Sequence, residues 1–151
     1  EKQNLELELQ EKLLEWDRET LELVSSVKGI GKRASAELLI YTQGFRDMNS
    51  YKQLISYAGL SPTEYRSGSS IRGRVRICKQ GGKQLRHILY MCALNAKKTN
   101  TQCRELFERL VEKGKNKKAA VIAVCNKLLK IVFGVVKNRV FYQDNFIQKS
   151  A

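Results

Sequence analysis

The stretch AAVIAVCNKLLKIVFGVV, residues 119–136, is apolar on nearly all sides of a helix. It approaches the roughly 20 residues that a helix needs to cross a membrane. Asn126, Lys127 and Lys130 interrupt the apolar run, which favours the buried core helix of a soluble bundle over a membrane span. We therefore expect this segment to be the central helix of a bundle, and we expect no membrane partner.

Working outward, the rest of the chain is mostly helical in pattern. Apolar residues recur at helical spacing over residues 83–98 and 102–112, and Asn49 or Ser50 is placed to cap a short helix that ends at Tyr57. A short β-hairpin with arms over residues 63–67 and 71–78 is the exception, because Ile71 to Ile77 alternates apolar and basic residues. The expected fold class is mainly α, a helical domain with one short hairpin.

The N-terminal helical pattern carries a possible coiled-coil seam. Apolar or small residues follow the heptad spacing at Leu9, Leu13, Trp16, Thr20, Leu23 and Val27. An amphipathic helix packed on its own domain fits the pattern equally well, because barely three heptads are present. We expect residues 1–24 to be the end of a coiled-coil helix that joins two copies, residues 25–141 to be the domain, and residues 142–151 to be a loosely ordered tail.

A glycine-rich turn follows that helix at Gly29-Ile30-Gly31, and the small residues Ala34 and Ala36 come directly after it. This pattern resembles the helix-hairpin-helix motif, in which backbone N–H groups and a helix N-terminus hold a DNA phosphate. The alternative is an ordinary corner between two helices that needs two glycines for its geometry.

The charge is strongly basic and uneven. The formal net charge is +13, and residues 65–104 hold ten Lys or Arg and no Asp or Glu. A surface of this kind is typical of nucleic-acid binding. We expect the following residues to contact nucleic acid: Lys28, Gly29, Gly31, Lys32, Arg33, Arg66, Gly68, Arg72, Arg74, Arg76, Lys79, Lys83 and Arg86.

The cysteines and the one histidine do not form a metal-binding pattern. Cys78, Cys92, Cys103 and Cys125 show no Cys-x-x-Cys pair, and His87 is the one histidine available to help them. We expect reduced thiols, no metal or other cofactor in this chain, and a cytoplasmic protein. The chain begins inside a helical pattern without Met, so we also expect it to be a piece of a longer protein.

Several ordered motifs between Leu23 and Phe141 together resemble the C-terminal domain of insertion-sequence transposases of the one-ten and eleven-eleven type. These transposases are related to Piv-like invertases and bridge-RNA-guided recombinases. The motifs are Gly29-Ile30-Gly31, Tyr57-Ala58-Gly59-Leu60-Ser61-Pro62, Ser67-Gly68, Ile77-Cys78-Lys79-Gln80-Gly81, Leu85-Arg86, Lys113-Gly114-Lys115 and Lys127-Leu128-Leu129.

The resemblance implies a DNA recombinase of a mobile element in which Ser67 is the nucleophile and forms a covalent phosphoserine with DNA. It also implies a separate N-terminal RuvC-like domain that binds divalent metal, expected to be Mg, and in some relatives a structured guide RNA. No general base for Ser67 is evident in the sequence, because Glu64 and His87 have no clear geometric relation to it. We expect the intact protein to be an enzyme and this chain alone to be inactive.

Two other functions fit the same residues. The chain could be a non-catalytic DNA- or RNA-binding module, or a dimerisation piece whose basic surface is incidental. A covalent protein–DNA adduct separates the recombinase from the binding module, and salt-dependent binding separates both from the dimerisation piece.

Overall fold

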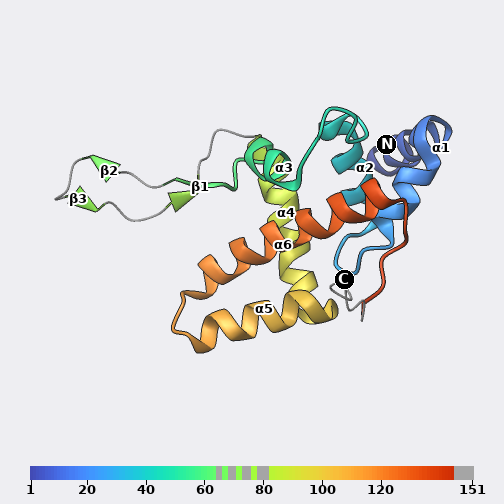
Figure 1. Cartoon of the computed structure of the whole chain (residues 1–151). Coiled ribbons are helices and arrows are strands. Elements are labelled where there is room, and N and C mark those ends of the chain that lie inside the picture. The colour runs from blue at the N-terminus through green and yellow to red at the C-terminus, as the bar shows by residue number, and fades with distance from the viewer. Residues whose placement is uncertain (64–65, 68–70, 73–75, 78–81, 145–151) are drawn as a thin grey trace.

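The computed structural model describes residues 1–63, 66–67, 71–72, 76–77 and 82–144, and the fold is mainly α, as predicted. The helices are α1 (Lys2–Ser25), α2 (Lys32–Thr42), α3 (Tyr51–Tyr57), α4 (Lys83–Thr99), α5 (Thr101–Glu112) and α6 (Lys117–Asn138). Figure 1 shows α6 crossing the body of the molecule, with α4 and α5 against one part of it and α1 and α2 near its C-terminal end. Four two-residue strands extend away from this helical body.

Helix α6 is the centre of the core, which confirms the interpretation of residues 119–136. It contacts α1, α3, α4 and α5, and Val124, Cys125, Leu128, Leu129 and Val132 on it are fully buried. By length and composition α6 could span a membrane. In this fold nine of its residues are buried against the helices around it.

Polar side chains fix the ends of several helices. The Ser50 side chain accepts a hydrogen bond from the Gln53 N–H at 3.2 Å, so Ser50 is the N-cap of α3, as predicted. Asn100 is fully buried between α4 and α5 and accepts a hydrogen bond from the Cys103 N–H at 3.2 Å. Its amide nitrogen donates to the Lys28 carbonyl at 3.0 Å, which ties the turn before α2 to the junction of α4 and α5.

Helix α1 is kinked at Asp17, whose φ of −155° and ψ of 70° are not helical. The Asp17 carboxylate accepts a hydrogen bond from the Thr20 N–H at 3.2 Å, so it caps the second half of the helix as an N-terminal residue would. On that half the expected seam residues Thr20, Leu23 and later Val27 are buried in the domain itself. The coiled-coil interpretation therefore does not apply to the second half of the seam.

The first half of α1 is different, because most of its leucines face solvent. Leu13 is buried, but Leu5, Leu7, Leu9 and Trp16 are each at least 42% exposed. Of the seam residues in this half, Leu9 and Trp16 are partly exposed, and the Trp16 ring also lies under the Arg46 guanidinium, 5.1 Å from the ring centroid.

The strands form two antiparallel pairs. β1 (Pro62–Thr63) pairs with β4 (Arg76–Ile77), and β2 (Arg66–Ser67) pairs with β3 (Ile71–Arg72). We call these four strands the arm (Figure 1). The residues that would join the two pairs into one hairpin lie outside the described residues, so the continuous hairpin stays a prediction.

The segment after α6 is held against the domain, at least as far as Asp144. The Tyr142 N–H donates to the Ser26 hydroxyl at 3.0 Å, and Asp144 accepts hydrogen bonds from Thr101. The expectation of a loose tail over residues 142–151 is therefore wrong for Tyr142 and Asp144, because side-chain hydrogen bonds that the sequence pattern does not reveal anchor them. Residues 145–151 lie outside the described part of the chain.

Candidate nucleic-acid interface

The arm carries the expected nucleophile. Ser67 lies in β2 opposite Ile71 of β3, and Arg66 of β2 lies opposite Arg72 of β3. The antiparallel register thus places the backbone of two arginines and Ser67 within one two-residue pair. Arg76 is in β4, whereas Gly68, Arg74 and Lys79 fall outside the described residues.

The two glycines of the turn before α2 have different roles. Gly29 has a φ of +106°, and a Cβ atom built on it would lie 2.5 Å from the Ala96 Cβ and 2.8 Å from the Ala96 Cα. Both the backbone conformation and the close approach to α4 therefore require glycine. Gly31, the N-cap of α2, has a φ of −81°, and a Cβ there would meet nothing within 4 Å. Packing against α4 explains why residue 29 is glycine, but it gives no reason why residue 31 is glycine.

The basic residues of this turn are not equally available. The Lys28 ammonium is 3.1 Å from the Asp144 carboxylate. The Arg33 guanidinium contacts Glu37 at 3.0 Å and Glu6 at 3.1 Å. The hydrogen bond to Glu37, followed by the charges of Glu6 and Glu37, raises the pKa of Arg33. Among the described residues, Lys32 has no such partner, so it is the most accessible cation of the three.

Asp144 collects several donors at the start of α5. It accepts hydrogen bonds from the Thr101 N–H at 3.0 Å, the Thr101 hydroxyl at 2.8 Å and the Tyr142 hydroxyl at 2.9 Å, besides the Lys28 ammonium. The backbone N–H of Thr101 is the largest cause that holds the pKa of Asp144 well below its usual range. Asp144 is thus a fixed anion that competes with any phosphate for Lys28.

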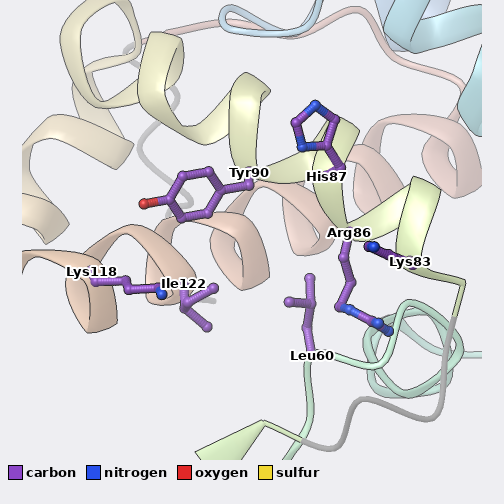
Figure 2. Close-up of a pocket in the computed structure, with 7 residues that line it drawn as sticks. All are labelled: Leu60, Lys83, Arg86, His87, Tyr90, Lys118 and Ile122. Atoms are coloured by element: carbon purple, nitrogen blue, oxygen red, sulfur yellow. The ribbon is translucent and has the colours of Figure 1, made fainter.

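A cavity of about 400 Å³ lies between α4 and α6 at the root of the arm. Lys83, Arg86, His87 and Tyr90 of α4 line it on one side. The other wall is formed by Lys118 and Ile122 of α6, together with Leu60, which precedes β1 by two residues. No carboxylate is among these lining residues. Figure 2 shows Lys83 and Arg86 at one end, Lys118 at the other, and Leu60 and Ile122 between them.

Two of the lining residues, Lys83 and Arg86, are among the nucleic-acid contacts predicted from the sequence. The other lining residues were not predicted to belong to a site. Lys118 belongs to the basic run at residues 113–118, which by sequence looks like a solvated turn. Tyr90 and Ile122 look like ordinary helix positions. His87 is exposed on α4 and also lines the cavity. Because α4 and α6 are far apart in the sequence, no local sequence pattern can show that these residues line one cavity.

The three cysteines in the described part of the chain lie in the core. Cys92, Cys103 and Cys125 are buried free thiols, and burial raises the pKa of Cys92 to about 11 and those of Cys103 and Cys125 to about 12. Over the described part of the chain, no group of three or more His, Cys, Asp or Glu is placed to hold a metal ion. Cys78 lies outside that part.

Comparison with known proteins places these features in a family. Residues 21–108 match the family described as Transposase IS116/IS110/IS902. Over 121 residues the chain is 37% identical to the pilin gene-inverting protein of Moraxella lacunata, covering 79% of this chain and 38% of that protein.

Two insertion-element proteins are more distant relatives. The 43.6 kDa protein of insertion element IS110 from Streptomyces coelicolor is 26% identical over 81% of this chain, and the 42 kDa protein of insertion element IS900 from Mycobacterium paratuberculosis is 27% identical over 80% of it. The chain spans 30% of the length of each. The matched region contains the glycine turn, the arm and the whole of α4. The chain therefore belongs to the IS116/IS110/IS902 transposase family.

Proposed function

We propose that the chain is the C-terminal, DNA-binding domain of a DNA transposase or site-specific recombinase, and that it supplies a serine nucleophile for strand cleavage and exchange. The observation that carries the proposal is the arm, which lies inside the family match and places Ser67 in a strand pair with Arg66 and Arg72. In that setting a hydroxyl and several cations are close in the chain, as phosphoryl transfer requires.

In the proposed step, the Ser67 Oγ attacks a DNA phosphorus atom and forms a phosphoserine ester. One bridging oxygen of the phosphodiester leaves with its bonding electrons, and the hydroxyl proton passes to a base. A serine hydroxyl is a weak nucleophile without such a base. The family resemblance suggests that metal-bound groups of a separate RuvC-like domain, with Mg, complete the site.

Arginine suits the second requirement of this reaction. The transition state spreads negative charge over the equatorial phosphoryl oxygens, and planar guanidinium groups bind such oxygens in pairs. We assign this role to the arginines of the arm, Arg66, Arg72, Arg74 and Arg76. They also hold DNA before reaction, because phosphate contacts fix its position without reading its sequence.

The turn before α2 supports a second phosphate contact of the helix-hairpin-helix type. The N-terminus of α2 has no acidic residue in its first turn, Gly31 leaves open space there, and Lys32 is exposed beside it. A non-catalytic DNA- or RNA-binding module would use the same contacts, and guide RNA would be a second ligand for them. Failure to trap a covalent DNA adduct with the intact protein would favour that alternative.

Binding of this chain to duplex DNA is expected to depend steeply on salt. Seven basic residues and no acid lie between Arg66 and Arg86. With six or more phosphate contacts, affinity should fall about a thousandfold or more between roughly 50 and 200 mM salt. Fluorescence anisotropy with two unrelated duplex sequences measures this, and both should give the same slope. An affinity that does not change with salt would refute the proposed interface.

We also propose that the first half of α1 pairs with a second copy of the chain, since Leu5, Leu9 and Trp16 lie on one helix face and are exposed.

Action on DNA is consistent with the cytoplasmic location that we propose.

Replacing both Leu5 and Leu9 by Lys is expected to lower the sedimenting mass to that of one chain, because it puts charges into the apolar contact. Met91→Lys is the matched control, since Met91 is 54% exposed on α4. A single-chain mass for the unaltered protein would contradict the pairing.

A further inference from the structure

We propose that the cavity between α4 and α6 binds one unpaired nucleotide of a nucleic-acid strand. One flanking phosphate lies at Lys83 and Arg86, the next lies at Lys118, and the base lies against Tyr90 and Ile122. This inference rests on the proposed nucleic-acid function and adds to it a second site, away from Ser67, that discriminates single strands from duplex.

The first argument is the charge at the ends of the two helices. Lys83 is the first residue of α4, and Lys117 and Lys118 are the first two of α6. Neither helix has an acidic residue in its first turn. Gly82 gives α4 no side-chain cap, whereas the Asn116 side chain caps α6 by accepting a hydrogen bond from the Lys118 N–H at 2.8 Å. Cations are unfavourable at the positive end of a helix dipole. Lysines at two such helix starts make this cavity electropositive, which suits a phosphate group.

The second argument is the apolar middle of the cavity. Figure 2 shows the Tyr90 ring beside Ile122, with Leu60 between them and the Arg86 end. A phosphate alone, or the outside of a duplex, would gain nothing from such a wall. A base would, because aromatic side chains bind bases by stacking whatever their sequence. A volume of about 400 Å³ also lies within the range of roughly 300–1,000 Å³ that is common for small-ligand sites.

The third argument is position. Leu60 comes just before β1, and α4 begins six residues after Ile77 of β4, so the cavity lies where both ends of the arm join the helical body. A strand seated in the cavity can therefore continue toward the arm that carries Ser67. Holding an unpaired nucleotide there would position the strand next to the proposed site of cleavage.

The test uses the 151-residue chain and fluorescence anisotropy with three probes of equal length: a thymidine strand, a strand of abasic sites and a duplex. Tyr90→Leu should weaken binding of the thymidine strand about tenfold, because a stacking contact is lost, and should leave the abasic strand unchanged. Lys118→Gln should weaken both single strands. Lys98→Gln is the matched control, since Lys98 is an exposed lysine at the opposite end of α4.

The results separate this inference from the proposed function. Equal losses from Lys118→Gln and Lys98→Gln, or equal binding of thymidine and abasic strands by the unaltered chain, would overturn the nucleotide site while salt-dependent duplex binding still supported the interface. No binding of any probe would overturn both. Photocrosslinking of a 5-iododeoxyuridine strand to the unaltered chain gives an independent check: an adduct on the peptide that contains Tyr90 supports the site, and adducts confined to other peptides refute it.

Discussion

Ser67→Ala in the intact protein is expected to abolish strand exchange and the covalent protein–DNA adduct. The change removes one hydroxyl and no charge, so DNA affinity should stay nearly unchanged while the rate of cleavage falls by about a thousandfold or more. Denaturing gel analysis of protein and labelled DNA detects the adduct, and a plasmid recombination assay measures the exchange.

Two neighbouring serines serve as controls, because Ser69 and Ser70 also lie close to the arginines in sequence. Ser69→Ala and Ser70→Ala should recombine normally. If one of them loses recombination while Ser67→Ala keeps it, the assigned residue is wrong. If all three recombine normally, the serine mechanism fails for this protein.

Arg74→Ala should instead weaken binding of all sequences and lower the salt slope by about one.

Gly29→Ala is expected to destabilise the domain by about 3 kcal/mol or more, because it adds backbone strain at a positive φ to a clash with the backbone of α4. Thermal unfolding followed by circular dichroism measures the loss. Gly31→Ala is the matched control, since its new methyl group would stand in open space at an ordinary φ. It should cost about 1 kcal/mol or less, as a changed N-cap does.

The comparison of these two variants also tests the interpretation of the turn. Equal destabilisation by both would mean that Gly31 has a structural role that the packing does not show. A nearly wild-type melting temperature for Gly29→Ala would mean that the turn can move away from Ala96, and the junction described here between α2 and α4 would then be wrong.

The helices were predictable because their signals are local. The apolar run of residues 119–136 identifies α6, Gly82 marks the start of α4, and Ser50 caps α3. The heptad pattern of α1 is visible in the sequence, but it fits both a coiled coil and a helix packed on its own domain. Its outcome depends on the kink at Asp17: the seam residues after the kink are buried in the domain, whereas before it Leu13 is buried but Leu9 and Trp16 are partly exposed.

The site was less predictable, because its contacts join distant parts of the chain. The basic stretch indicates the interface, but Lys28 pairs with Asp144 and Arg33 pairs with Glu6, and no spacing rule connects those residues. The same holds for the cavity, where Lys83 and Lys118 line opposite ends of one site only after α4 and α6 have packed. The sequence therefore predicted that the surface is basic, but it did not predict which basic residues are paired with carboxylates.

The position of α6 has a consequence for synthesis. The ribosome makes this helix after α1, α3, α4 and α5, the four helices that pack on it, so their inward-facing residues have no complete core until residue 136 or so has been translated. Domains generally fold as units, so we expect the nascent chain to complete its core only when almost the whole domain has been made. A nonsense change before Lys117 would remove the nine buried residues of α6 and is expected to leave the preceding helices without a core.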